Sequence, residues 1–283
     1  MPQLTDIGYI RDLLSRHGFH FEKKLGQNFL INPSVCPRMA QLSGADKTSG
    51  VLEIGPGIGV LTRELALVAG KVVAIELDER LLPVLAETLS EQENVTVIPG
   101  DVLKLDLHAL IKEQFPDRPV QVCANLPYYI TSPIIMALLE SRLPVESITV
   151  MVQREAAVRL CAKPGTRACG AVSLAVQYYA EPEMLFSVSG GSFLPAPKVD
   201  SAVIRLNIRK NPVCEVRDEK RLFSLIRAAF EQRRKTLPNA LMTAGYRKEE
   251  NLLALEKAGI PVTARAEQLT LQQFADLSNA YDR

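Results

Sequence analysis

The stretch Val51-Leu-Glu-Ile-Gly-Pro-Gly-Ile-Gly-Val60, written VLEIGPGIGV, joins a short apolar run to three glycines that alternate with other residues. The apolar run predicts a buried strand, and the apolar spacing of residues 60–67 predicts a helix. Glycines between a strand and a helix let the backbone turn sharply and let a ligand approach the main chain. Such a turn is a weak signal alone, because many folds connect strands to helices through glycine.

The alternation of strand and helix continues beyond this stretch. Strands are predicted over 51–54, 71–75, 95–98, 119–124 and 147–152, and helices over 60–67, 79–89, 105–113 and 133–140. This pattern specifies a parallel sheet covered on both faces. Strands at 184–188 and 201–208 then follow in direct succession, which favours antiparallel pairing at the sheet edge. We therefore expect an α/β, Rossmann-like fold with a mostly parallel sheet and an antiparallel edge.

Helical patterns flank the predicted sheet. One helix is predicted over 5–17, and four more over 216–231, 236–243, 247–258 and 268–279. Asn211-Pro212 has the composition of a boundary between domains. We expect one domain over residues 1–210, with an N-terminal extension, and a small all-α domain over residues 211–283.

Composition excludes several classes of protein. The five cysteines stand singly without a CxxC pair, and the three histidines form no metal-spaced cluster, so we expect no metal site and the reduced thiols of a cytoplasmic protein. We find no secretory signal and no apolar run of the roughly 20 residues that span a bilayer, so no membrane association is expected. Residues 1–195 carry a net charge of −4 and residues 196–283 a net charge of +5, which hints at a polyanionic partner.

Two carboxylates follow the next two predicted strands. Glu76 ends VVAIE, where a carboxylate can accept both hydroxyls of a ribose, and Asp101 follows the third strand as the last residue of VTVIPGD, where it can accept from an adenine amino group. Either acid alone could instead cap a helix or a turn. The glycine spacing departs from G-x-G-x-x-G, which disfavours a dinucleotide. The acidic pocket, without a phosphate-binding lysine, suits an adenosine group that carries no phosphate.

The strand over 119–124 leads into CANLPYYITS, residues 123–132. Polar and aromatic side chains at the carboxyl end of a strand lie where an open α/β sheet binds its ligands. With Glu53–Gly59, Glu76 and Asp101, the NLPY turn resembles the successive motifs of S-adenosylmethionine-dependent methyltransferases that act on the 6-amino group of adenine.

Further segments narrow the resemblance. Residues 24–30 (KLGQNFL), 193–203 (FLPAPKVDSAV) and 230–237 (FEQRRKTL) are similar to those of the small-subunit (16S) ribosomal RNA adenine dimethyltransferases of the KsgA/RsmA type, and the likeness covers residues 10–280. Cys169 departs from the family's preference for an aromatic residue. The resemblance implies a class I methyltransferase fold, the donor S-adenosyl-L-methionine and the product S-adenosyl-L-homocysteine. It also implies a monomer that dimethylates two adjacent adenosines in a hairpin loop near the 3' end of 16S rRNA, within the immature 30S subunit, and assists subunit biogenesis.

The resemblance also assigns cofactor contacts residue by residue. Gln27, Asn28 and Leu30 would hold the methionine end, and Gly55 would offer its backbone. Glu76 would bind the ribose, Asp101 the adenine, and Asn125 would lie near the sulfonium.

The NLPY turn suits chemistry on an exocyclic amine, whose lone pair is delocalised into the ring. The side-chain oxygen of Asn125 and the carbonyl of Leu126 can each accept one amino hydrogen and favour a pyramidal nitrogen, while Pro127 stiffens the turn. Tyr128 offers a face for the base, worth about 1–3 kcal/mol. Phe193, in a loop rich in glycine and proline, is the expected second face. A base held in this way must leave its stack.

The C-terminal domain is expected to recognise RNA. Arg233, Arg234 and Lys235 follow an amphipathic helix and could contact phosphates, although an ordinary solvated helix surface has the same composition.

Four alternatives remain open. They are an NAD-dependent dehydrogenase, a DNA adenine methyltransferase, a large-subunit rRNA methyltransferase that confers macrolide resistance, and an assembly factor that only binds the cofactor. PKVDSAV and FEQRRKTL favour the small-subunit enzyme.

Overall fold

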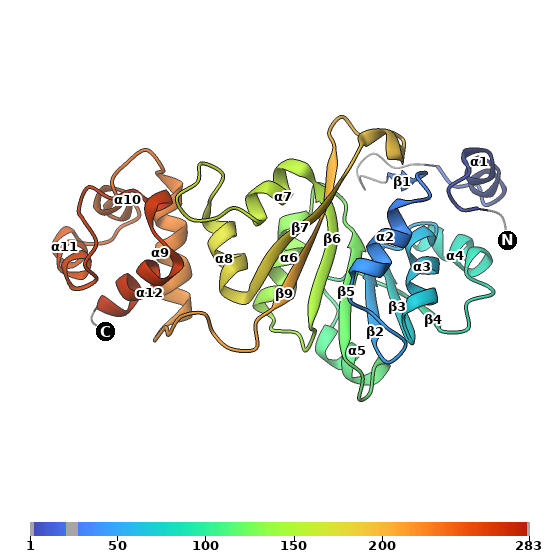
Figure 1. Cartoon of the computed structure of the whole chain (residues 1–283), viewed down its shortest axis with the longest axis horizontal. Helices are drawn as coiled ribbons and strands as arrows, with labels where there is room; N and C mark the ends of the chain where they lie inside the picture. The colour runs from blue at the N-terminus through green and yellow to red at the C-terminus, as the bar shows by residue number, and fades with distance from the viewer. Residues whose placement is uncertain (1–2, 21–27, 282–283) are drawn as a thin grey trace. The chain divides into compact units, whose positions relative to one another are not determined.

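The computed structural model describes residues 3–20 and 28–281, which form two compact units (Figure 1). The first contains Met1–Ala157 and Glu183–Ile208, and the second contains Val158–Pro182 and Arg209–Arg283. The predicted boundary at residue 210 lies two residues from the last division. The structure differs from the predicted domains in one respect, because residues 158–182 belong to the second unit.

A seven-stranded sheet forms the centre of the first unit, in the order β4-β3-β2-β5-β6-β9-β7. Its strands are β2 (Gly50–Ile54), β3 (Lys71–Glu76), β4 (Val95–Pro99), β5 (Val120–Asn125), β6 (Ser147–Gln153), β7 (Ala180–Val188) and β9 (Ser201–Ile208). The pairs from β4 to β6 are parallel, and β9 runs antiparallel to β6. The predicted sheet with an antiparallel edge is confirmed.

Short helices alternate with these strands. They are α2 (Val35–Leu42), α3 (Val60–Val68), α4 (Leu82–Thr88), α5 (Leu107–Gln114), α6 (Thr131–Glu140) and α7 (Arg154–Leu160), which extends into the second unit. Every residue of β2 is buried, as expected for a central strand covered on both faces. Buried side chains of α2 and α3 form one cluster with strand residues such as Val51, Cys123 and Met151.

The N-terminal helix α1 (Ile7–Arg16) is capped by Asp6, whose carboxylate accepts from Tyr9 N at 2.7 Å. Its buried residues Ile10 and Leu13 share a cluster with residues of α4. The chain then forms β1 (Phe29–Leu30), which pairs antiparallel with β8 (Phe193–Leu194). This two-stranded sheet, absent from the sequence prediction, brings Leu30 opposite Phe193.

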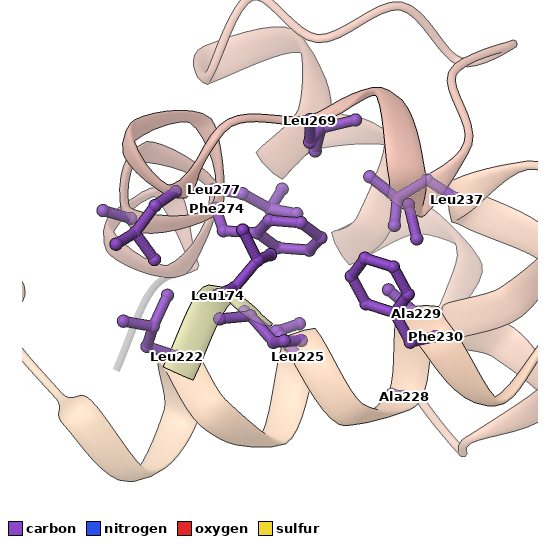
Figure 2. Packing of buried hydrophobic residues seen from close by; sticks show 14 of the residues in the cluster. Leu174, Leu222, Leu225, Ala228, Ala229, Phe230, Leu237, Leu269, Phe274 and Leu277 are labelled. Atoms are coloured by element: carbon purple, nitrogen blue, oxygen red, sulfur yellow. The ribbon is translucent and has the colours of Figure 1, made fainter. Parts of the chain in front are cut away.

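The second unit is helical. It contains α8 (Ala171–Tyr179), α9 (Glu219–Glu231), α10 (Leu237–Thr243), α11 (Lys248–Lys257) and α12 (Leu271–Ala280). The last four confirm the predicted helices, but α8 was not predicted. Figure 2 shows its core, where the rings of Phe230 and Phe274 lie 6.2 Å apart and Leu174 of α8 joins them. Residues 158–182 therefore supply part of this core.

Candidate active site

One pocket collects the predicted site residues at the carboxyl ends of the parallel strands. It encloses about 1200 Å³ of empty space, part of which opens to solvent. Ten of the predicted residues line it: Asn28, Leu30, Gly55, Glu76, Asp101, Asn125, Leu126, Pro127, Tyr128 and Phe193. Gln27 lies outside the described residues. The structure thus brings these side chains together, while their individual roles stay predictions.

The glycine turn after β2 forms one wall of the pocket. Gly55, Gly57 and Gly59 have φ angles of +68°, +61° and +89°, a region that favours glycine. A side chain built at Gly55 would meet no atom within 4 Å, so the main chain there faces open space. A ligand can therefore approach the Gly55 backbone directly.

Glu76, the last residue of β3, is held by the backbone. Its Oε2 accepts from Gly57 N at 3.2 Å and its Oε1 from Asp78 N at 2.8 Å. The residue is 6% exposed, and burial raises its pKa while the two backbone bonds oppose that effect. A carboxylate has about four acceptor positions. Glu76 therefore keeps capacity for the two hydroxyls of a ribose.

Asp101 makes a local turn contact as well as lining the pocket. Its Oδ1 accepts from Leu103 N at 3.0 Å, and its Oδ2 lies 3.4 Å from Lys104 Nζ. The alternative interpretation, an acid that caps a turn, is therefore confirmed for one oxygen. Because the side chain is also 27% exposed, acceptor positions remain for an amino group.

The pocket is acidic. Glu53, Glu76, Asp78 and Asp101 line it, whereas no arginine or lysine is among its described lining residues. Glu53 is 1% exposed, and its Oε2 has no hydrogen-bond partner in the described part of the chain. Burial raises the pKa of this carboxyl to about 8, and the charge of Glu76 adds to the effect. The carboxylates of Glu76, Asp78 and Asp101 and the open glycine turn fit a phosphate-free adenosine carrying a sulfonium and an ammonium group.

The two proposed acceptors of the NLPY turn are uncommitted. Within the described residues, neither the side-chain amide of Asn125 nor the backbone carbonyl of Leu126 takes part in a hydrogen bond. The Leu126 N–H donates to Met151 O at 3.2 Å, and the Pro127 carbonyl accepts from Ile130 N and Thr131 Oγ1, both at 3.2 Å. Hydrogen bonds to other atoms thus hold the turn in place. The oxygens of the Asn125 side chain and the Leu126 carbonyl remain available to accept from a ligand.

The two aromatic residues differ in their surroundings. The Tyr128 hydroxyl is hydrogen-bonded to Ser201 Oγ at 2.6 Å, and burial raises the pKa of the phenol. Phe193 is 2% exposed and belongs to β8, which follows a 3₁₀ turn over Gly190–Ser192. The predicted loop at Phe193 is therefore wrong, because pairing with β1 orders this segment. Its ring still lines the pocket.

Sequence reasoning missed two features of this site. The lack of a hydrogen-bond partner at Glu53 Oε2 among the described residues depends on packing from several elements. The bond between Tyr128 and Ser201 joins residues 73 positions apart, and neither motif spacing nor composition indicates it.

The three residues of the basic run in the second unit, Arg233, Arg234 and Lys235, differ in their contacts. Arg233 Nη2 donates to Arg167 O, Cys169 O and Glu267 Oε2 at 2.8, 3.1 and 3.1 Å. Arg234 and Lys235 are exposed, and Lys235 Nζ lies 3.1 Å from Thr243 Oγ1. Arg233 thus holds a loop of its own unit, which the sequence did not indicate.

Two kinds of feature are absent from the described residues. No group of three or more His, Cys, Asp and Glu residues there could hold a metal ion. No helix in the same part of the chain has the length and apolarity to cross a membrane.

The fold and the pocket together define a class. A seven-stranded, mostly parallel sheet with a glycine turn, acidic strand ends and an NLPY turn is the arrangement of a Rossmann-like methyltransferase. The model of the family described as "Ribosomal RNA adenine dimethylase" matches residues 18–283. The chain belongs to this family.

Curated relatives support the same assignment. A protein of Geobacillus thermodenitrificans named "Ribosomal RNA small subunit methyltransferase A" is 50% identical over 278 residues, which cover 96% of this chain and 95% of the relative. A protein of the same name from Bacillus mycoides is 50% identical over 285 residues, covering 99% and 98%.

Solved structures show the same fold. The 23S rRNA methyltransferase ErmE matches with a TM-score of 0.69 at 29% identity, covering 90% of this chain and 100% of that one. A dimethyladenosine transferase from Plasmodium falciparum matches with a TM-score of 0.73 at 25% identity, covering 88% and 95%. These relatives speak against the dehydrogenase alternative.

Proposed function

We propose that this chain transfers methyl groups from S-adenosyl-L-methionine to the 6-amino groups of two adjacent adenosines in a hairpin loop near the 3' end of 16S rRNA. In each transfer an N–C bond forms as the S–C bond of the donor breaks, and one amino proton leaves to water. The products are dimethyladenosines and S-adenosyl-L-homocysteine. The observation that carries the proposal is the pair of uncommitted oxygens, on Asn125 and Leu126, at the edge of an acidic pocket without a lysine or arginine among its described residues.

The chain's residues orient the substrate amine. Bound S-adenosyl-L-methionine supplies an electrophilic methyl group. Asn125 Oδ1 and Leu126 O accept the two amino hydrogens, so the nitrogen becomes pyramidal and its lone pair points toward the pocket. The ring of Tyr128 supports the base from one side and that of Phe193 from the other. Orientation and stabilisation of the developing charge on nitrogen supply the catalysis.

Asn28, Leu30, Gly55, Glu76 and Asp101 would hold the donor, as the family resemblance assigns them. The carboxyls of Glu76 and Asp101 keep acceptor positions that suit ribose hydroxyls and an adenine amino group. Because none of these described contacts is basic, a donor with a positive sulfonium fits better than a phosphorylated nucleotide.

The substrate is best sought in the small ribosomal subunit. Two relatives that are 50% identical to this chain over nearly their whole length are named as small-subunit methyltransferases. The 23S rRNA methyltransferase ErmE is only 29% identical. We further propose a monomer that acts in the cytoplasm on immature 30S particles and assists their biogenesis, with Arg234 and Lys235 of the second unit toward phosphates.

The experiment is transfer of a radiolabelled methyl group to purified immature 30S subunits, followed by mapping of the modified bases. We expect label in two adjacent adenosines as dimethyladenosine. Asn125→Ala should lower the rate by about 100-fold or more, because one of two preorganised acceptors is lost.

Two control substrates separate the alternatives. Label in 23S rRNA of immature 50S subunits, but not in 30S subunits, would favour the large-subunit alternative, and label in single-stranded DNA would favour a DNA methyltransferase. Full activity of Asn125→Ala would contradict the mechanism. Cofactor binding without transfer to any substrate would favour an assembly factor.

A further inference from the structure

Ser201 lies at the pocket end of the sheet, on a strand that carries no residue of the predicted site. It is the first residue of β9 and pairs with Gln153, the last residue of β6. The serine is fully buried, at 0% exposure. In the described residues, the hydroxyl of Tyr128 at 2.6 Å is the only hydrogen-bond partner of its side chain.

The backbone beside Ser201 is held on both sides. The Asp200 carbonyl accepts from Arg154 N at 2.9 Å, and the Asp200 carboxylate accepts from Gly190 N at 3.0 Å. From Ser201 onward the chain follows the ladder with β6. The serine hydroxyl is therefore presented from a fixed strand and not from a loop.

Tyr128, by contrast, projects from a turn three residues after the end of β5. A hydrogen bond at the far end of its ring prevents the ring from swinging about χ1. The position of the ring determines where a stacked base lies, and so where its amino group meets Asn125 Oδ1 and Leu126 O. Displacements of about 1 Å in such an arrangement can cost about 100-fold in rate.

We infer that Ser201 is a positioning residue of the active site, whose hydroxyl holds the Tyr128 ring where the target adenine stacks. This inference rests on the proposed function. It assigns a role in the reaction to the antiparallel edge of the sheet, which otherwise only completes the fold.

The test is a double-mutant cycle of Ser201→Ala and Tyr128→Phe, each of which removes one hydroxyl and keeps the aromatic ring. The single-turnover rate of methyl transfer to immature 30S subunits is measured at saturating cofactor and particle. We expect each single variant to be about 3- to 10-fold slower, the range that one hydrogen bond supports. The double variant should be no slower than the singles, and the Kd of S-adenosyl-L-methionine should be unchanged.

Ser147→Ala is the matched control. Ser147 is also a buried first residue of a sheet strand, at 1% exposure, and its hydroxyl donates to Ser43 O at 3.1 Å. It begins β6 at the end opposite to Gln153, so it lies away from the pocket. We expect it to lower the thermal midpoint as Ser201→Ala does, while the methyl-transfer rate stays at the wild-type value.

The outcomes separate the inference from the proposed function. If the wild-type chain transfers no methyl group to immature 30S subunits, the proposed function itself is contradicted. An active wild type with full rates for Tyr128→Phe or Ser201→Ala, or with effects that multiply in the double variant, would overturn the inference alone. If Ser201→Ala does not fold, the Tyr128→Phe rate decides, because that variant leaves the buried serine in place.

Discussion

Protonation of Glu53 should affect the stability of the first unit. Burial raises the pKa of its carboxyl from 4.5 to about 8. A carboxyl with a higher pKa in the folded chain binds more protons there than in the unfolded chain. The free energy of unfolding therefore falls as pH rises from about 4.5 to about 8, by up to about 5 kcal/mol at 1.36 kcal/mol per pKa unit.

Glu53→Gln should remove this dependence, since glutamine stays neutral at every pH. Compared with the wild type, the variant should gain thermal stability steadily from pH 4.5 to pH 8 in the absence of cofactor. Thermal midpoints at pH 5, 6.5 and 8 measure the difference. Glu91→Gln, at an exposed position, is the control and should show no such trend. A difference for Glu53→Gln that is constant with pH would count against a protonated buried carboxyl.

The residues of the site were predictable to the extent that strand ends determine them. Glu76, Asp101 and Asn125 each end or follow an apolar run, and parallel strands bring such positions to one edge. Pairings between side chains distant in sequence, such as Tyr128 with Ser201, have no local signal. Their partners depend on how the antiparallel strand β9 is seated against β6.

At the scale of elements, the glycine turn between β2 and α3 is the most sensitive connection. Gly57→Ala should cost about 1 kcal/mol of stability, because φ there is +61°. It should also weaken cofactor binding several-fold. The new Cβ would lie 3.3 Å from the Phe29 ring, and Gly57 N holds Glu76 Oε2.

Gly259→Ala separates the two effects. Its φ of +65° imposes nearly the same strain, but no atom lies within 4 Å of a Cβ built there. We expect a similar loss of thermal stability and an unchanged Kd for S-adenosyl-L-methionine, measured by calorimetry. Equal weakening of cofactor binding in both variants would show that the effect is global.

Variants within the run Arg233-Arg234-Lys235, in the loop after α9, should separate an effect on stability from an effect on RNA binding. Arg233→Ala should destabilise the helical unit by about 1 kcal/mol, because it loses bonds to two carbonyls and a partly exposed carboxylate. The double variant Arg234→Ala/Lys235→Ala should keep the thermal midpoint of the wild type.

For binding to 30S particles, the two variants should rank in the order opposite to that for thermal stability. The double variant should bind more weakly and with a smaller dependence on salt, by about one unit of slope for each phosphate that the two side chains neutralise. Its cofactor affinity should not change. Normal particle binding by the double variant would leave the basic run without a role toward RNA.

The elements themselves were largely predictable, for reasons that vary along the chain. The long apolar runs of β3, β5 and β6 and the amphipathic pattern of α9 are strong local signals. The two-residue strands β1 and β8 are too short to show a period, and their pairing across about 160 residues creates them. Helix α8 was missed because its sequence, AVSLAVQYY, is mainly apolar and shows little periodicity.

At the scale of the whole molecule, the two units are interleaved in sequence. Cys169, Leu174 and Tyr178 are buried in the core of the second unit, together with residues of α9 and α12. A chain that ends at residue 210 keeps these apolar side chains but loses the helices that cover them.

We therefore expect the 1–210 fragment to be less soluble than the full chain and to bind a dye specific for exposed apolar surface. Amide hydrogen exchange should show reduced protection in residues 171–179, while β2, β3 and β5 remain protected. Full protection of residues 171–179 in the fragment would mean that α8 is stable without α9 and α12.

The division of the chain also bears on the order in which it folds as it is synthesised. A ribosome releases residues 158–179, which include α8, before strands β7 and β9 and long before α12. The sheet can be completed once β9 has emerged, whereas α8 cannot pack into its core until the C-terminal helices have been synthesised. Ordering of the pocket at the strand ends during translation should therefore precede that of the helical unit, whose core is complete only when almost the whole chain has left the exit tunnel.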